Sequence, residues 1–373
     1  MADAKHMKRR LLLSSFAALL LAAGGAYLLE DKFTVLGLRV ARLHSLTTKV
    51  SPTGIAWSPD GEKIAAIHDF GRAISVWNTG GDLLITIKRE LTTGPYVGSS
   101  LAFMPDGRSI LAPAPTPTHY PTSSLGLWDV QTGALQRVVP APSSDKIFQE
   151  VLAGIFVVSP DGTLVAFRPI HDVGPISIYR TDDWSLLKTR PIFESETRGL
   201  KPSAITGETR PDFPDIVTAL AFAPNNDLAV GLIDGLAMMG SSSSILQYIE
   251  GRTVRSLAYS PNGQFVATGI GTMLSSTSAA HLVHLQIREV ASGSAVVNDN
   301  TIGDVRNLAW DREGQILAVV TTDETVHLYR PFASGSAHQD MSVSKGAFTL
   351  AFSPTKSELA VSTGTGVDIY SVR

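Results

Sequence analysis

The chain has 373 residues, of which 44% are hydrophobic, 17% charged and 7% aromatic, and its formal net charge is -3. This is the composition of a globular protein with one large domain or two smaller ones, and it excludes disorder as the main state. The negative net charge gives the chain no electrostatic reason to bind nucleic acid. The absence of cysteine excludes disulfides, thiolate metal sites and a cysteine nucleophile.

The first 32 residues differ from everything that follows. A basic cluster, Lys8-Arg9-Arg10, precedes a run without charge from Leu11 to Leu29. This pattern is typical of a signal peptide or of a signal anchor that forms a transmembrane helix. Because the positive charge precedes the apolar run, we expect the rest of the chain to face the bacterial periplasm, either anchored in the inner membrane or secreted. Small residues up to Ala26 suit cleavage, whereas Leu28-Leu29 extends the run to a spanning length, so both outcomes stay open.

A short phrase then recurs to the end of the chain, at intervals of 37 to 64 residues. Most copies join an apolar pair to a Pro and a following Asp-Gly or Asn-Gly. Proline ends a strand because it cannot donate to the ladder, and the Gly supplies the positive φ of a tight turn, so each copy predicts a strand, a turn and a second strand. The seven copies are Ala56-Trp57-Ser58-Pro59-Asp60-Gly61, Ala102-Phe103-Met104-Pro105-Asp106-Gly107, Val157-Val158-Ser159-Pro160-Asp161-Gly162, Ala221-Phe222-Ala223-Pro224-Asn225-Asn226, Ala258-Tyr259-Ser260-Pro261-Asn262-Gly263, Ala309-Trp310-Asp311-Arg312-Glu313-Gly314 and Ala351-Phe352-Ser353-Pro354-Thr355-Lys356.

The first unit predicts four strands. After its turn come a strand at 63–67, a loop at 68–72, a strand at 73–77, a turn and a strand at 83–87. One such sheet cannot bury both of its faces, so the units must stack face to face, and seven in a ring bury a continuous core. The predicted fold class is all-β: a seven-bladed β-propeller with four-stranded antiparallel blades, preceded by an N-terminal hydrophobic helix.

These repeats resemble the WD-repeat (WD40-like) β-propeller family over residues 33–373. The most specific fragment is Leu127-Trp128-Asp129-Val130-Gln131-Thr132-Gly133, and a looser version is Val76-Trp77-Asn78. No Gly-His pair precedes the first strands and only one blade has Trp-Asp, so the chain resembles a divergent, bacterial-type member that lacks most of the family's buried side-chain network. The resemblance implies that residues 34–46 supply the outer strand of the last blade, which closes the ring and removes its exposed edges.

Four long segments interrupt the repeats, at residues 113–122, 168–175, 191–215 and 271–281. The resemblance implies that all four open on one face of the ring, called the top face, over blades two to five. Loops on a rigid scaffold often carry binding sites, although these could be neutral surface insertions. The candidate partner-binding residues on the top-face loops are His68, Asp69, His119, Tyr120, His171, Asp172, Arg198, Arg210, Phe213 and His281.

The histidines allow a chemical alternative. Converging imidazole and carboxylate groups could bind a metal or polarise a substrate. However, an Asp in this loop is a structural turn residue in the family that the chain resembles, and loops of unequal length need not converge. The sequence also lacks the Gly-x-Ser-x-Gly turn of hydrolases, a phosphate-binding loop and a helix-borne His pair. We therefore predict no catalytic, cofactor-binding or metal-binding residue.

The resulting functional prediction is a non-catalytic protein-protein interaction scaffold, anchored in the membrane or periplasmic. It binds a protein partner that is itself in the membrane or periplasm, and it could be an accessory subunit of a membrane complex. It uses no cofactor and binds no nucleic acid. The alternative is a periplasmic propeller enzyme or metal-binding protein that uses the histidine-bearing top-face loops. The family resemblance supports the first reading by association alone.

Overall fold

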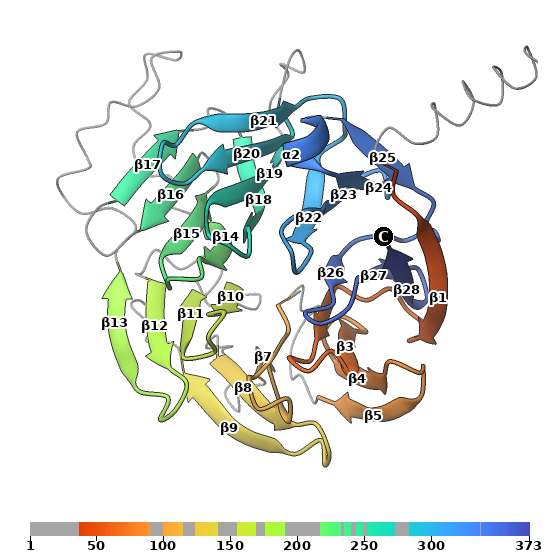
Figure 1. Ribbon diagram of the computed structural model, residues 1–373. Helices are drawn as coiled ribbons and strands as arrows, with labels where there is room; N and C mark the ends of the chain where they lie inside the picture. Colours follow the sequence, from red (N-terminus) through yellow and green to blue (C-terminus); the bar gives the residue numbers. More distant parts are fainter. Residues whose placement is uncertain are drawn as a thin grey trace, which may run out of the picture.

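The structure is a computed structural model that describes residues 37–89, 100–114, 124–140, 155–168, 176–190, 217–232, 235–239, 244–248, 252–272, 283–335 and 337–373. Figure 1 shows that the sheets surround a common axis, which confirms an all-β propeller with four-stranded antiparallel blades. Among the described residues no helix has the length and apolarity to cross a membrane. The apolar run from Leu11 to Leu29 lies outside them, so the N-terminal hydrophobic helix stays a prediction.

Within the described residues the strands form seven sheets, each with four strands in hydrogen-bonded order. Blade one has β2 (Gly54–Trp57), β3 (Lys63–His68), β4 (Ala73–Asn78) and β5 (Leu83–Lys88); blade two has β6 (Ala102–Phe103), β7 (Ser109–Pro113), β8 (Ser124–Asp129) and β9 (Leu135–Pro140). Blade three has β10 (Ile155–Val158), β11 (Leu164–Arg168), β12 (Ile176–Arg180) and β13 (Leu186–Arg190); blade four has β14 (Val217–Phe222), β15 (Leu228–Leu232), β16 (Gly235–Met239) and β17 (Ser244–Tyr248).

The remaining three blades complete the ring. Blade five has β18 (Arg252–Tyr259), β19 (Phe265–Thr272), β20 (Leu285–Glu289) and β21 (Ala295–Asp299); blade six has β22 (Val305–Trp310), β23 (Leu317–Thr321), β24 (Val326–Tyr329) and β25 (His338–Met341), with the short helix α2 (Pro331–Ser334) before β25. Blade seven has β26 (Leu350–Phe352), β27 (Glu358–Thr363), β28 (Gly366–Val372) and β1 (Val40–Thr47).

The core lies between the blades. Each pair of neighbouring blades shares one apolar cluster. In β3, Ile64 and Ala66 pack toward blade seven, whereas Ala65 and Ile67 pack toward blade two. Successive side chains of a strand point to opposite faces, so a second strand that is buried on both faces needs an unbroken apolar run. This is why the sequence reads Ile64-Ala65-Ala66-Ile67 rather than alternating with polar residues.

The recurring phrase forms the turn that was predicted from it. In blade one the buried Ser58 hydroxyl accepts the backbone N–H of Lys63 at 2.8 Å and donates to the Asp60 carboxylate. The Asp60 pKa lies below its usual value, chiefly because Ser58 and the Glu62 amide donate to it. The same turn occurs at Ser159, which donates to the Asp161 carboxylate, and at Ser260, which donates to the Asn262 side-chain carbonyl; each of these hydroxyls also accepts a backbone N–H. The phrase is thus a hydrogen-bonded unit that fixes the hairpin between the first two strands.

The turn glycines also join neighbouring blades. Gly162 has φ 71°, and a Cβ at this position would collide with Pro105 in the corresponding turn of blade two. Gly263 and Gly314 lie against the matching prolines of the blades before them. Glycine is required here both by the left-handed backbone and by the close approach of the next turn. The Pro and Gly of the phrase therefore act between blades as well as within one.

Two tryptophans connect the innermost strands. The Trp57 indole N–H donates to the Ala351 carbonyl at 3.0 Å, and the Trp310 indole N–H donates to the Ala258 carbonyl at 3.2 Å. Both bonds run from the first strand of one blade to the first strand of the blade before it. A buried indole needs such an acceptor, so these bonds fix how the neighbouring strands meet around the axis.

The ring is closed by strands from the two ends of the described chain. Strand β1 pairs antiparallel with β28 from Val40 opposite Val372 to Thr47 opposite Gly366, and the two lie side by side in Figure 1. The predicted closing strand spans residues 34–46, whereas the observed strand is Val40–Thr47; residues 34–36 lie outside the described chain. Gly37, three residues before the strand, has a left-handed backbone at φ 62°.

A buried carboxylate reinforces the closure. Asp368 in β28 accepts hydrogen bonds from Ser45 Oγ of β1 at 2.6 Å and from Ser344 Oγ at 2.7 Å, and it forms an ion pair with Arg42 at 3.4 Å. Burial alone would raise the pKa of this carboxyl. The two hydroxyl donors and the Arg42 charge outweigh burial, so the Asp368 pKa lies below its ordinary value.

Substituting Gly162 with Ala should destabilise the propeller more than the same change at Gly293. Both glycines have a left-handed φ, which costs an alanine about 1–2 kcal/mol. Gly293 has open space around it, whereas Gly162 faces Pro105, so Gly162→Ala should lose about a further 1–3 kcal/mol through overpacking. Urea denaturation of both variants measures the difference, and equal losses would contradict packing between the turns.

Asp368→Asn should weaken the closure in a pH-dependent way. Because the folded-state pKa is depressed, the carboxylate stabilises the fold fully above its unfolded-state pKa of about 3.9 and loses that contribution as pH falls through the folded-state value. We expect the variant to lose about 1–3 kcal/mol at pH 7. The gap to wild type should shrink below about pH 4. Denaturation of both proteins at pH 7 and pH 3 measures this, and a gap that does not change with pH would argue against it.

Candidate functional site

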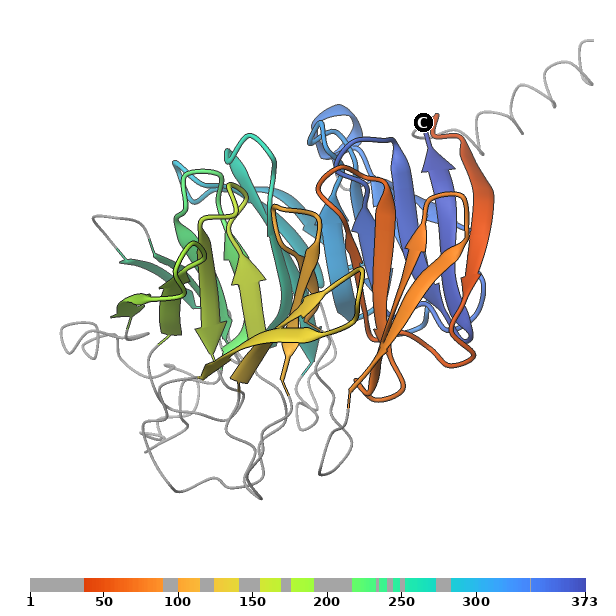
Figure 2. The ribbon, with the colours of Figure 1, turned by 90° about the horizontal axis from the view of Figure 1, so that it is seen from below.

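The two faces of the ring carry different connections. The antiparallel order places the turns between first and second strands on one face, here called the turn face, and the connections between second and third strands on the other, here called the loop face. Figure 2 shows the blades edge-on, with their strands running between these faces. The predicted top face is the loop face. Its long segments connect β7 to β8, β11 to β12, β13 to β14 and β19 to β20.

Most of the candidate partner-binding residues lie in these segments. Eight of the ten fall outside the described residues, so their roles stay predictions: His119, Tyr120, His171, Asp172, Arg198, Arg210, Phe213 and His281. His68 and Asp69 are described, and they lie at the connection between β3 and β4 in blade one.

His68 is a buried strand residue rather than a loop residue. It ends β3, and its Nε2 lies 2.9 Å from Ser75 Oγ in β4, which in turn lies 3.0 Å from Thr86 Oγ1 in β5. Burial lowers the His68 pKa, which favours the neutral ring. The three side chains tie the outer three strands of blade one together. Ser75 and His68 have the spacing of a nucleophile and its base, but both are buried and no carboxylate of the described chain bonds to His68 Nδ1.

Asp69 and Phe70 both reach the surface at this connection. Asp69 and Phe70 both have left-handed backbones, with φ 52° and 53°, and the Gly71 N–H bonds to the His68 carbonyl at 3.0 Å. Such two-residue turns favour Asn-Gly, and a bulky aromatic at positive φ is a genuine outlier. Phe70 is nevertheless 60% exposed, the largest value among the exposed large hydrophobics of the described chain. The turn therefore keeps both backbone strain and an apolar ring at the surface, a combination that marks functional sites.

A buried arginine supports this turn from below. Arg89 follows β5 and donates to the backbone carbonyls of Gly71 and Pro113, and its guanidinium lies over the Trp128 ring at 5.3 Å from the centroid. A buried cation is stable only where its N–H groups find acceptors, and the two carbonyls with the aromatic face provide them. Arg89 thus joins the Phe70 turn of blade one to the loop-face end of β7 in blade two.

The Trp-Asp fragment supplies the surface under Arg89. The Trp128 indole folds back over Gly126, where an added Cβ would overlap the ring. Asp129 accepts the backbone N–H groups of Thr132 at 2.7 Å and Gln131 at 2.9 Å, and these bonds, with the one from Thr132 Oγ1, lower its pKa. Trp128 therefore supports the loop face, while Asp129 organises the next turn on the opposite face.

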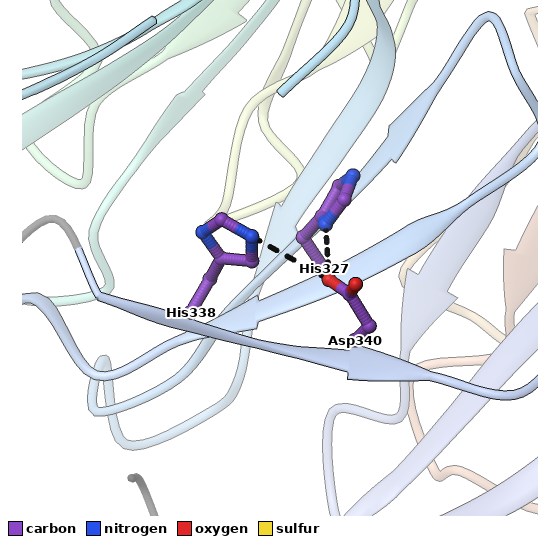
Figure 3. A group of neighbouring side chains, drawn as sticks. All are labelled: His327, His338 and Asp340. Carbon is purple, nitrogen blue, oxygen red and sulfur yellow. Dashed lines mark hydrogen bonds and ion pairs between the residues drawn. The ribbon is translucent and has the colours of Figure 1, made fainter. Parts of the chain in front are cut away.

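A second group of polar side chains was missed by sequence reasoning. His327 in β24 lies beside His338 and Asp340 in β25, on the outer part of blade six (Figure 3). His327 Nδ1 is 2.7 Å from Asp340 Oδ1, and His338 Nε2 is 3.5 Å from the same oxygen. Burial lowers the His327 pKa despite the carboxylate. The helix α2 and a turn separate His327 from His338 in the chain, so the group does not match a known metal-binding sequence spacing. The signal that the sequence does contain is the alternation His-x-Tyr in one strand and His-x-Asp in the next.

The fold and its strand order define the protein class as a β-propeller. The family model described as WD domain, G-beta repeat (WD40) matches residues 243–276. This stretch contains β17, β18 and β19, so the sequence repeat joins the outer strand of blade four to the first strands of blade five. The chain is thus a β-propeller in which one stretch matches the WD40 repeat.

A relative is similar to part of the chain. An uncharacterized WD repeat-containing protein of the cyanobacterium Synechocystis sp. (strain ATCC 27184 / PCC 6803 / Kazusa) is 39% identical over 79 residues. The match covers 21% of this chain and 21% of that protein. It extends the repeat resemblance but assigns neither an activity nor a partner.

Arg89→Met should loosen the loop face. The change leaves the Gly71 and Pro113 carbonyls without their charged donor, and hydrogen bonds to charged groups contribute about 1.5–3 kcal/mol each. We expect a loss of about 3 kcal/mol in the free energy of unfolding and faster hydrogen exchange at the Gly71 amide. The neighbouring Arg72 is exposed, so Arg72→Met should change stability by less than about 0.5 kcal/mol. Similar losses in the two variants would show that Arg89 is not the support described above.

Proposed function

We propose that the protein is a non-catalytic scaffold that binds a protein partner on its loop face, with Phe70 as an anchor of the contact. The WD40-repeat propeller fold supports this, since such propellers commonly act as protein-interaction scaffolds. The residues around Phe70 support binding rather than chemistry, because His68 is buried in the sheet and Arg89 is engaged by backbone carbonyls and Trp128.

Phe70 is the observation that carries the proposal. Nothing in the turn needs an aromatic, because Asn or Gly would form the same backbone with less strain. An exposed aromatic on a well-supported base is the kind of residue that dominates protein interfaces, and burying a Phe side chain contributes about 1.5–3 kcal/mol. Arg89 holds the base of the turn in place before a partner binds, which lowers the entropy lost on association.

The proposal also places the scaffold at a bacterial inner membrane, facing the periplasm, or in the periplasm after cleavage. The basic cluster Lys8-Arg9-Arg10 and the apolar run after it support this placement. The partner is then a membrane or periplasmic protein. If the segment is retained, the protein could act as an accessory subunit whose apolar segment packs against other transmembrane helices.

Phe70→Asn should separate binding from folding. Asn tolerates the left-handed backbone, so the variant should be as stable as wild type or slightly more stable. Leu83→Ala is the matched control, because Leu83 is 55% exposed in the same blade but lies at the turn face. The full-length protein, tagged at its C-terminus, is purified from its host in mild detergent, and a stoichiometric partner is then produced separately for binding measurements.

We expect the Phe70→Asn variant to bind that partner at least about tenfold more weakly, whereas Leu83→Ala binds like wild type. If Phe70→Asn binds the partner with wild-type affinity, the loop face of blade one is not part of the interface. Recovery of the propeller without any stoichiometric protein would contradict the scaffold function. The intact mass of the purified chain decides between cleavage near Ala26 and a retained anchor.

A further inference from the structure

We propose that His327, His338 and Asp340 form a binding site for a divalent transition metal, most suitably Zn²⁺. The site lies on the outer part of blade six, in a different blade from the Phe70 turn. One ligand atom from each residue lies within 4.8 Å of the other two, and Figure 3 shows the two rings and the carboxylate converging. An ion between them could reach the usual zinc distances of about 2.0–2.2 Å through small side-chain rotations.

The strand pairing builds the group. His327 lies directly opposite Asp340 across the β24–β25 ladder, and Tyr329 lies directly opposite His338. Residues two apart on a strand share a face, so all four side chains project from the same side of blade six. The outermost strand thus contributes two of the three proposed ligands, and the buried third strand contributes the remaining one.

A second carboxylate orients His338 from the neighbouring blade. Asp299, at the end of β21 in blade five, is buried and lies with Oδ2 at 3.4 Å from His338 Nδ1. The same oxygen accepts the Tyr329 hydroxyl at 2.9 Å. Metal-binding histidines typically donate their second ring N–H to such a carboxylate, which fixes the tautomer. When the His338 ring is neutral and its Nδ1 proton is directed at Asp299, an unprotonated Nε2 faces Asp340.

That arrangement leaves two acceptors facing each other. In neutral His338, Nε2 and the Asp340 Oδ1 atom, 3.5 Å apart, both offer lone pairs. A cation between these two atoms would accept both lone pairs. His327 has hydrogen-bond partners with and without a metal. Without a metal, Nδ1–H donates to Asp340; when Nδ1 binds a metal, Nε2–H can donate to Thr321 Oγ1 at 3.4 Å. A metal can therefore replace the proton on His327 Nδ1 and bind His338 Nε2 while the neighbouring side chains keep their positions.

The donor set selects the kind of metal. Two imidazole nitrogens and one carboxylate oxygen suit Zn²⁺ and similar ions better than Mg²⁺ or Ca²⁺, which prefer oxygen ligands. The Asp340 side chain is 65% exposed, which gives the ion a path from solvent and leaves a fourth position for water. A bound ion would fasten β25 to β24 and, through Asp299, blade six to blade five.

Metal binding by the purified protein tests the proposal. The untagged full-length chain, in mild detergent, is stripped with a chelator and then dialysed against Zn²⁺, and Co²⁺ is titrated separately as a visible-absorption probe. His338→Gln and Asp340→Asn each remove one ligand. Asp340→Asn changes an exposed side chain of the outermost strand and should fold normally. His284→Gln is the matched control, because His284 makes a similar pair with Asp304 at 3.0 Å and the described chain offers no third ligand beside it.

We expect wild type and His284→Gln to bind one Zn²⁺ per chain and to give the absorption of nitrogen- and oxygen-ligated Co²⁺. His338→Gln and Asp340→Asn should no longer bind the single Zn²⁺. Asp299→Asn, which removes the carboxylate beside His338, should bind Zn²⁺ about 10- to 100-fold more weakly. Circular dichroism verifies that each variant is folded. A wild-type chain that takes up no saturable Zn²⁺, or ligand variants that bind it as wild type does, would overturn the site.

Discussion

Every blade of this protein has two apolar faces, and neither face can be exposed. The second strands show the constraint most directly, since β3, β15 and β23 are buried along almost their whole length. A single sheet of this kind would leave half of its apolar surface in water, so its stability comes from its neighbours. The apolar clusters between successive blades, the turn glycines against the preceding prolines and the indole bonds of Trp57 and Trp310 all act between sheets. The ring therefore has to form as a whole, and its closure by β1 is part of the core.

The features that sequence reasoning predicted well are those with local causes. The Ser-Pro-Asp-Gly phrase carries its own hydrogen bonds, from Ser58 to Asp60 and to the Lys63 amide, so the turn could be derived without knowing the neighbours. His68 was placed in a loop because its type and its neighbour Asp69 look like loop residues. Its real partner, Ser75, lies across the ladder, and the register that joins them is not visible in the sequence. The group at His327 and His338 was missed for the same reason, because only strand pairing brings β24 and β25 residues together.

The loop face depends on the packing beneath it. Phe70 stays in a strained conformation because the turn is held by the hydrogen bond from Gly71 to His68 and by Arg89, which in turn lies on Trp128 of the next blade. A backbone strain of about 1–3 kcal/mol is small beside the apolar area buried between blades, so a cooperative ring tolerates it. Buried polar groups are paired in the same way. His68 pairs with Ser75 within blade one, whereas Tyr329 of blade six pairs with Asp299 of blade five.

The pairing of β1 with β28 has a mechanical consequence. The two strands run antiparallel, and the pair is extended at one end by the Arg39 and Arg373 backbones, which bond to each other at 2.7 and 3.0 Å. A pull on the chain ahead of Arg39, directed away from the ring, would load these two hydrogen bonds first and then each following pair in turn. Strands pulled apart in this way break their hydrogen bonds one after another at low force. Strands pulled along their length load all of their hydrogen bonds at once and need a higher force. Tension on the N-terminal side would therefore open the propeller at the β1–β28 seam, and the bonds of Asp368 with Arg42 and Ser45 are the side-chain contacts that resist this opening.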